Sequence, residues 1–320
     1  MRHLLKWLAA IVLCAGMAIP VPPAQAKVPG PNGQIAFSRY VQDDNTVTYT
    51  ANPDGSHLRR LFPGFSGGPR WSPDGSQVSV FAGCTDGEEN CAATIVDPDT
   101  GTFRQFKWPD PTLETPCGAG WSPDGTRLLC GGFGVTDPSR NGIYTIRVSD
   151  GRGLRRITSN PGGEDIPGDY SPDGQRLVFS RINPSRPAKA NVALFVVNVD
   201  GSGLRRITPW GLPFWEDGGR WSPDGTTILF DNRKSLFVVR PDGSGLAKIP
   251  LVTHSFSRLQ NPNWSPDGTK IVVSLFTRTS PGTEQAGIYT ANADGSNIQR
   301  VTNSPTFDRD GDWGPHPLAG

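Results

Sequence analysis

The sequence predicts an all-β protein, a six-bladed β-propeller built from four-stranded antiparallel blades, on three observations. A Trp-Ser-Pro-Asp-Gly unit recurs along the chain, and its copies lie about 50 residues apart. Short runs of alternating apolar and polar residues, separated by Gly-rich turns, follow each copy. With 39 glycines and 31 prolines in 320 residues, the chain is also interrupted too often for long helices.

The repeated unit begins with an aromatic residue on the expected first strand of a blade. Four copies read Trp-Ser-Pro-Asp-Gly, at 71–75, 121–125, 221–225 and 264–268. A fifth, at 170–174, begins with tyrosine, and a degenerate copy, Asp-Trp-Gly-Pro, occupies 312–315. The aromatic positions are separated by 50, 49, 51, 43 and 49 residues, which gives six units.

Each unit contains the same order of strands. In the third, residues 176–180 and 193–198 form two alternating runs, Asp200-Gly201 follows, and residues 204–208 form a last short run. Asp-Gly between two such runs predicts a tight hairpin, because that turn needs positive φ angles. Together with the strand that carries the aromatic residue, this makes four strands, the number in a propeller blade.

The two ends of the repeat predict how the ring closes. Residues 34–38 match the second strand of a blade but have no aromatic strand before them, and Trp313 lies on a first strand with no further strand after it. We expect these two segments to share the sixth blade, which also hides sheet edges that would otherwise pair with other chains.

The N-terminus predicts export. Arg2 and Lys6 precede an apolar run at 7–19, and Ala24-Gln25-Ala26 gives a small-x-small cleavage pattern before Lys27. The run is shorter than the roughly 20 apolar residues of a membrane span. We therefore expect a signal peptide at 1–26, a single propeller domain at 27–320, and a secreted or periplasmic location.

Charge excludes some partners. Removal of the signal peptide takes away two basic residues and changes the formal net charge from +1 to −1. A nearly neutral chain has no general attraction for nucleic acid or for an anionic membrane. We expect a monomer whose partner is a protein or peptide, in the cell envelope or outside the cell, and no cofactor beyond a possible divalent cation.

Four cysteines remain after the signal peptide, and in an oxidising compartment an even number predicts disulfides. Cys117 and Cys130 flank the turn at 122–125 symmetrically, which places them opposite each other on adjacent antiparallel strands. That pairing leaves Cys84 with Cys91, closing one loop.

The Trp-Ser-Pro-Asp-Gly unit, followed by an Asn-x-Asp-Gly-Ser hairpin such as that at 292–296, resembles the repeat of the TolB-like propellers, a WD40-like repeat. The resemblance covers essentially all of the chain after residue 26 and implies six blades. In TolB itself an α/β domain precedes the propeller, whereas the first strand here is expected near Gln34. Contacts made by such a domain therefore cannot be carried over.

We expect the functional surface on one face of the ring. The Ser-Pro-Asp-Gly turns and Asp-Gly hairpins lie on one face, which we call the turn face, and all are short and uniform. The second-to-third-strand loops and the crossovers between blades lie on the other, the variable face, with long loops at 82–91, 131–141, 181–190 and 276–286. Variable loops on a rigid scaffold usually carry function.

Two groups of residues on the variable face are candidates. Carboxylates recur before the first strands and predict an acidic rim for a cation or a basic peptide, unless they cap turns or face solvent: Glu114, Glu164, Asp165, Glu216, Asp217, Asp308 and Asp310. His254 enters the same zone but has no histidine nearby in sequence. The loop at 209–215 contains Trp210, Phe214 and Trp215, which form either an exposed recognition patch or a loop buried on its own blade.

Arginine pairs at 59–60, 155–156 and 205–206 recur on the outermost strands, and we interpret them as structural charges that protect sheet edges. Gly64-Phe65-Ser66-Gly67-Gly68 fits the Gly-x-Ser-x-Gly pattern, but it lies between strands, whereas a nucleophile elbow needs a strand-to-helix turn. No His-Glu-x-x-His motif, phosphate-binding loop or dinucleotide-binding fingerprint is present in the sequence.

Two functions remain open. The first is a non-catalytic module that binds a protein or peptide at the variable face. The second is a metal-assisted lyase or hydrolase of an extracellular polysaccharide, as in oligogalacturonate lyase-like propellers, with its metal in the channel mouth. For that enzyme only His57, His254 and His316 remain as histidines after the signal, far apart in the chain. Fold alone cannot decide between the two.

The cleavage pattern gives a direct prediction. When the full chain is expressed in a bacterium with a functional secretion system, intact-mass analysis of the exported protein should place its first residue at Lys27. Ala26→Leu removes the small residue before the cut and should leave uncleaved precursor. Exported protein that still carries Met1 and the 7–19 run would contradict the prediction.

Overall fold

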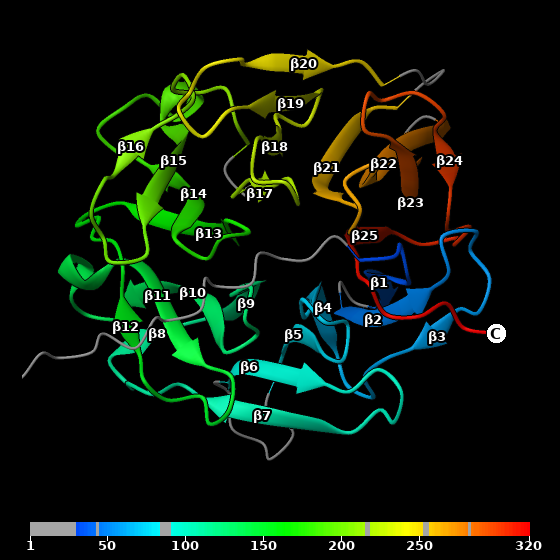
Figure 1. The fold of residues 1–320 in the computed structure, drawn as a ribbon, viewed down its shortest axis with the longest axis horizontal. Coiled ribbons are helices and arrows are strands. Elements are labelled where there is room, and N and C mark those ends of the chain that lie inside the picture. The colour runs from blue at the N-terminus through cyan, green and yellow to red at the C-terminus, as the bar shows by residue number, and fades with distance from the viewer. Residues whose placement is uncertain (1–29, 43–44, 84–90, 215–217, 252–255, 281–282) are drawn as a thin grey trace, which may run out of the picture.

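A computed structural model describes residues 30–42, 45–83, 91–214, 218–251, 256–280 and 283–320. Six antiparallel sheets are arranged as a ring around a central channel, as Figure 1 shows, so the predicted six-bladed propeller is confirmed. We number the blades from 1 to 6 by their first strands, beginning with the blade that contains Trp71.

The first three blades follow one another in sequence. Blade 1 contains β4 (Ser66–Trp71), β5 (Val78–Ala82), β6 (Cys91–Val96) and β7 (Phe103–Lys107). In blade 2 the inner strand is divided in two, and the strands are β8 (Leu113–Glu114), β9 (Cys117–Trp121), β10 (Arg127–Gly134), β11 (Gly142–Arg147) and β12 (Arg155–Arg156). Blade 3 contains β13 (Glu164–Tyr170), β14 (Arg176–Ile182), β15 (Val192–Asn198) and β16 (Arg205–Arg206).

The remaining blades complete the ring. Blade 4 contains β17 (Arg220–Trp221), β18 (Ile228–Asp231), β19 (Leu236–Val239) and β20 (Ala247–Ile249). Blade 5 contains β21 (Arg258–Trp264), β22 (Lys270–Ser280), β23 (Thr283–Asn292) and β24 (Gln299–Arg300). Blade 6 combines the C-terminal β25 (Asp308–Trp313) with β1 (Ile35–Gln42), β2 (Asn45–Ala51) and β3 (Arg59–Arg60). The helices of the described chain are two single 3-10 turns, Pro138–Arg140 and Ala188–Ala190.

The ring closes as the sequence predicts, through pairing of the two ends of the chain. β25 pairs with β1, and Trp313 stands opposite Ile35. The C-terminal residues after β25 then run beside the start of β1, where the amide of Gln34 donates to the carbonyl of His316 at 3.0 Å. The His316 ring also stacks on Trp71, with 5.1 Å between ring centroids, so the C-terminal segment joins blade 6 to blade 1.

The six repeated aromatic residues hold neighbouring blades together. Each is buried, with 3–9% of its surface exposed, and each belongs to a different one of six hydrophobic clusters. Every cluster combines strands of two adjacent blades. Trp221, for example, packs with Ile228 of its own blade and with Val178 and Leu194 of blade 3. The repeat period therefore sets one aromatic wedge per blade interface.

The Ser-Pro-Asp-Gly turn is closed by its own side chains. In the first copy the amide of Gln77 donates to Ser72 Oγ at 2.9 Å, and Ser72 Oγ donates to Asp74 Oδ1 at 2.6 Å. The amide of Ser76 donates to the same carboxylate at 3.1 Å. Gly75 has a φ of 73°, which explains why glycine ends the unit. These bonds fix the hairpin between the first two strands.

The Asp-Gly hairpins and the arginine pairs link each blade to its neighbour. A Cβ on Gly201, whose φ is 90°, would lie 2.8 Å from the carbonyl oxygen of Ile157 in blade 2, so only glycine allows this approach. The first arginine of a pair reaches the next blade, since Arg205 Nη2 donates to the carbonyl of Pro241 at 2.7 Å. The second arginine binds the crossover of its own blade, as Arg156 Nε donates to the carbonyl oxygen of Thr158 at 2.8 Å.

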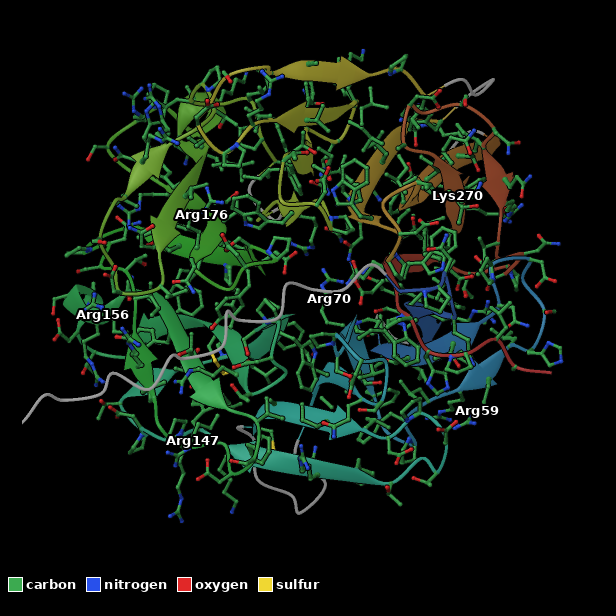
Figure 2. The ribbon with its side chains drawn as sticks, in the orientation of Figure 1. Arg59, Arg70, Arg147, Arg156, Arg176 and Lys270 are labelled. Carbon is green, nitrogen blue, oxygen red and sulfur yellow. A yellow bond between two sulfur atoms is a disulfide. The ribbon has the colours of Figure 1, made fainter. Side chains whose placement is uncertain are left out.

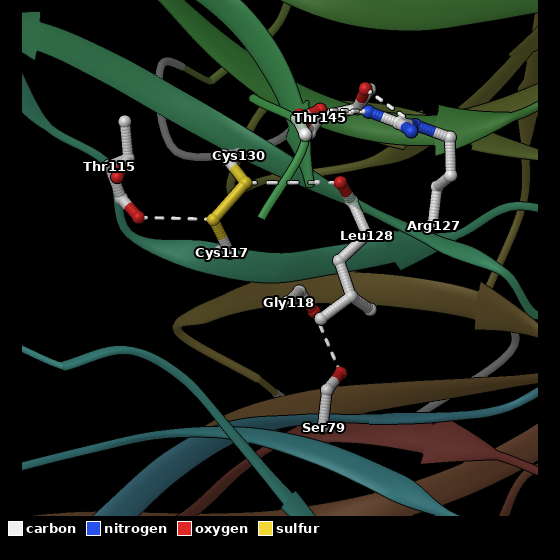
Figure 3. Close-up of a disulfide and its surroundings, with 9 residues drawn as sticks. Ser79, Thr115, Cys117, Gly118, Arg127, Leu128, Cys130 and Thr145 are labelled. Carbon is white, nitrogen blue, oxygen red and sulfur yellow. Dashed lines mark hydrogen bonds between the residues drawn. A yellow bond between two sulfur atoms is a disulfide. The ribbon is translucent and has the colours of Figure 1, made fainter. Parts of the chain in front are cut away.

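One predicted disulfide is present in the structure. Cys117 and Cys130 stand opposite each other on β9 and β10 and are bonded, 13 residues apart in the chain (Figure 3). Both side chains are fully buried, in the cluster between blades 1 and 2. The pairing follows from the symmetric placement of the two cysteines about the turn. Cys84 lies outside the described residues, so its pairing with Cys91 stays a prediction.

The contact that closes the ring gives a stability prediction. A Cβ on Gly33 would lie 1.8 Å from the carbonyl oxygen of His316, so Gly33→Ala must displace the C-terminal segment. We expect the free energy of unfolding in urea to fall by about 1–3 kcal/mol. Gly83→Ala is the matched control, because a Cβ there meets nothing within 4 Å. Equal unfolding midpoints for the two variants would contradict this account of closure.

The turn carboxylates give a pH prediction. Partial burial opposes ionisation of Asp74 and Asp124, but hydrogen bonds from the turn outweigh it and lower the pKa of both below the usual value. Because the unfolded chain then takes up protons first, stability should be constant above about pH 4 and fall below it. Urea unfolding at pH 7, 5 and 3 measures this. The fall should be smaller in Asp74→Asn, and an equal fall in that variant would count against the turn.

Candidate functional site

A cavity of about 720 Å³ opens at the centre of the variable face. Its walls come from the second-to-third-strand loops of blades 6 and 1, at residues 45–46 and 82–83, and from the crossover at 65–68 that enters blade 1. Inner strands, the second strand of blade 2 and the crossover that carries Trp108 contribute most of the rest. The cavity therefore lies on the face where the sequence predicts function.

Toward the turn face the channel narrows. The hollow there has a volume of only about 30 Å³ and is lined by the prolines of three repeat turns, Pro73, Pro123 and Pro172. Inner-strand residues that directly precede the repeated aromatics complete its lining, among them Asp169, Asn263 and Asp312. A ligand of peptide size therefore has access from the variable face.

Two arginines lie at the deep end of the cavity. They line both the 720 Å³ cavity and the 30 Å³ hollow beyond it. Arg70 on β4 and Arg220 on β17 come directly before Trp71 and Trp221, and they belong to blades 1 and 4, on opposite sides of the channel. Figure 2 shows Arg70 near the centre of the ring, whereas Arg147 lies at its circumference. Arg220 is buried and donates to the carbonyl of Gly219 at 2.9 Å.

Bulges in the inner strands of blades 5 and 6 place polar side chains in the cavity wall. Asn261 and Asp310 have positive φ angles of 52° and 60°, and both interrupt the register of their strands. A bulge redirects the side chain that it carries. Asn261 donates to Asp310, and Arg309 Nε lies 3.3 Å from the same carboxylate. All three residues line the cavity.

Aromatic residues of blades 1 and 2 form the opposite wall. Phe65 and Phe81 have 57% and 39% of their surface exposed, a large fraction for phenylalanine, and Trp108 and Phe133 are half-buried beside them. The Trp108 Nε1 atom is buried, and no group in the described part of the chain accepts its hydrogen bond. The cavity thus combines an apolar wall with three arginines, Arg70, Arg220 and Arg309, against one described carboxylate, an arrangement suited to a ligand with apolar and anionic parts.

Two carboxylates of the predicted acidic rim are not accessible. Asp165 and Asp308 are at most 1% exposed, and each is paired with an arginine at 2.7 Å, Arg181 for Asp165 and Arg39 for Asp308. Thr158 also donates to Asp165, at 2.5 Å. A carboxylate that is buried and neutralised in this way stabilises its blade and cannot bind a cation or a basic peptide.

The other predicted rim residues are dispersed. Glu114 is exposed on β8, where it pairs with Phe133, and Asp310 lines the cavity. Asp217 and His254 lie outside the described residues. Among the residues that the structure places, no group of three or more histidine, cysteine, aspartate or glutamate side chains could hold a metal ion.

The predicted aromatic loop lies away from the cavity. Trp210 is half-buried and packs edge to face on Phe195 of its own blade, with 5.8 Å between ring centroids, while Arg186 lies 4.6 Å from the Trp210 ring. Arg233 covers the Phe214 ring at 4.0 Å. These contacts favour the interpretation in which the loop packs on its blade. Trp215 lies outside the described residues, and a smaller hollow of about 380 Å³ borders Phe214.

Sequence reasoning missed the residues that line the cavity. Arg70 and Arg220 carry a usable signal, since the residue before each repeated aromatic faces the channel on an inner strand. Phe65 and Phe81 carry a weaker one, because a phenylalanine in a crossover or at a strand end is common in cores. The bulges at Asn261 and Asp310 have no sequence signal that we can identify.

The fold and the cavity define a class of protein: a propeller of six four-stranded blades with a cavity on its variable face that narrows toward the turn face. The TolB β-propeller domain family matches residues 112–316, so the chain belongs to that family. No helix among the described residues is long and apolar enough to cross a membrane.

Two sequence relatives illustrate the similarity. An uncharacterized protein from Agrobacterium fabrum is 30% identical over 219 residues, which cover 66% of this chain and 64% of the relative. The Tol-Pal system protein TolB from Francisella tularensis subsp. mediasiatica is 26% identical over 197 residues, 60% of this chain and 43% of the relative. The aligned regions thus span less than two thirds of either relative's length.

Solved structures show the same fold at lower identity. TolB from Acinetobacter baumannii has a TM-score of 0.63 at 19% identity, covering 88% of this chain and 66% of that one. An oligogalacturonate lyase in complex with manganese has a TM-score of 0.54 at 15% identity, covering 86% and 75%. Because TolB and a lyase both share the fold, these likenesses do not choose a function.

Proposed function

We propose that this chain is an exported, non-catalytic propeller that binds an extended segment of a protein partner in the cavity of its variable face. The observation that carries the proposal is the aromatic wall of that cavity. Large apolar side chains left open to solvent beside a concave surface are typical of recognition sites, and aromatic residues together with arginine dominate binding energy at protein interfaces. Phe65 and Phe81 have this exposure, and Arg70 lies below them.

The size of the cavity supports a segment of a partner as the ligand. Sites for drug-sized ligands measure roughly 300–1,000 Å³, and 720 Å³ falls within that range. The cavity therefore accommodates a few residues of an extended chain, and the surrounding loops provide further contact area.

The enzyme alternative has less support in the described residues. A metal-assisted lyase needs a group of metal-ligating side chains near the channel mouth. His57 lies in a hairpin turn, 3.0 Å from Ser56 Oγ, and His316 stacks on Trp71 near the turn face. Neither histidine lines the 720 Å³ cavity, and Asp310 is its one described acidic lining residue.

Loss of the aromatic wall should weaken the partner without unfolding the ring. Mature protein is immobilised and used to capture envelope and secreted proteins after cross-linking, with the double variant Phe65→Ser, Phe81→Ser in parallel. We expect one protein captured in stoichiometric amount by the natural chain, and at least about tenfold less by the variant, since two aromatic contacts each contribute on the order of 1–2 kcal/mol.

Phe103→Ser is the matched control, because Phe103 is as exposed as Phe81, at 39%, but lies on the outer part of blade 1. Its capture should equal that of the natural chain. Capture that is unchanged in the double variant would remove the cavity as the binding site. Thermal unfolding of all variants checks that the ring is intact.

A further inference from the structure

Arg70 has no carboxylate partner among the described residues, unlike the well-packed Arg39 and Arg181. Arg39 and Arg181, which are mostly buried, pair with Asp308 and Asp165 at 2.7 Å. Arg70 donates instead to two main-chain carbonyls, from Nη1 to Pro69 at 2.9 Å and from Nε to Ala119 at 3.3 Å. Carbonyl oxygens orient a guanidinium group but do not neutralise its charge. Within the described chain, no carboxylate forms an ion pair with Arg70.

The remaining donors of Arg70 are available to a ligand. A guanidinium group has five N–H bonds, and these two contacts use one each on Nε and Nη1. The Nη2 group has no hydrogen bond to a described residue. Arg70 lines both the large cavity and its narrow end, and it is half-buried there. A partly buried charge is costly unless a counter-charge is supplied, and a bound anion would supply it.

The lining of the large cavity is positive on balance. Arg220 and Arg309 line it as well, and its one described carboxylate, Asp310, already lies 3.3 Å from Arg309 and accepts from Asn261. At the narrow end Asp169 and Asp312 lie beside the arginines, and Asp312 already accepts from the amide of Trp71 and from Asn263. Charge complementarity in the large cavity thus favours an anionic group on the ligand.

We propose that Arg70 anchors a carboxylate of the bound partner segment, while apolar residues of the same segment lie against Phe65 and Phe81. This inference rests on the proposed function and names the chemistry that the site recognises. Guanidinium and carboxylate form paired, charge-assisted hydrogen bonds, which suits the free donors of Arg70. Because the channel narrows to about 30 Å³ beyond Arg70, the segment must end or turn there. The carboxylate is therefore a chain terminus or an acidic side chain at the tip of the segment.

Peptide pools test the anchor and distinguish its two sources. Immobilised mature protein is offered four pools of random hexapeptides: with a free or amidated C-terminus, and with or without Asp and Glu in the pool. Retained peptides are quantified by mass spectrometry. Retention of carboxylate-bearing pools should exceed that of the amidated neutral pool at least about tenfold, equivalent to 1.4 kcal/mol. An excess in the pool with a free C-terminus and no Asp or Glu identifies a chain terminus as the source of the carboxylate. An excess in the amidated pool that contains Asp and Glu identifies an acidic side chain.

Variants of Arg70 decide whether that residue carries the effect. Arg70→Gln should remove the excess, and Arg70→Lys, which keeps the charge without the planar fork, should retain part of it. Arg147→Gln is the matched control, because Arg147 is an exposed arginine at the circumference, paired with Asp150. Thermal unfolding shows that each variant is folded, and Arg70→Lys carries the test alone if Arg70→Gln is not.

The proposal that Arg70 anchors a carboxylate is wrong if all four pools are retained equally, if none is retained, or if Arg70→Gln keeps the full excess. These outcomes are separable from failure of the proposed function. Pools that fail while capture still depends on Phe65 and Phe81 leave the partner-binding function intact without a carboxylate anchor. Pools that succeed while no protein is captured show that the cavity binds a carboxylate ligand other than a protein partner.

Discussion

The structure depends on one repeated interaction, the insertion of an aromatic side chain between two blades. Such a side chain buries about 150–250 Å². At about 25 cal/mol per Å², that removes apolar surface worth roughly 4–6 kcal/mol from water at each interface. Trp71 and Trp313 lie on either side of the closure, where the last blade meets the first, so the ring is stabilised only when both ends of the chain are in place. The hairpins, turns and arginine pairs then fix how closely the blades approach.

This constraint explains why the fold can be predicted from the sequence, whereas the residues that line the cavity cannot. The aromatic wedge, the Ser-Pro-Asp-Gly turn and the Asp-Gly hairpin each have a local physical reason for their residues, and each recurs at a fixed period. The Cys117–Cys130 pairing follows from the same register. The cavity has no such period, because it is formed where six inner strands meet, and bulges at Asn261 and Asp310 change which side chains enter it.

The acidic rim shows what sequence position alone cannot decide. Asp165 and Asp308 occupy equivalent places near the starts of the inner strands of blades 3 and 6. Each is paired with an arginine on the adjacent second strand, Arg181 and Arg39. The pairing joins residues 16 positions apart in one case and 269 in the other. Only the register of the strands reveals that these carboxylates are neutralised.

The same register of the strands accounts for the positive charge of the large cavity's lining. Asp165 and Asp308, near the starts of two inner strands, are paired with arginines of the second strands, so their charge is hidden in the blades. Arginines that directly precede Trp71 and Trp221 have no second strand on their channel side, so their side chains line the cavity. The residues directly before the repeated aromatics are mixed in charge at the narrow end, where Asp169 and Asp312 lie with Arg70 and Arg220, whereas the lining of the large cavity contains three arginines and one described carboxylate. Selectivity for a carboxylate would thus arise from placement within the ring, without any overall charge.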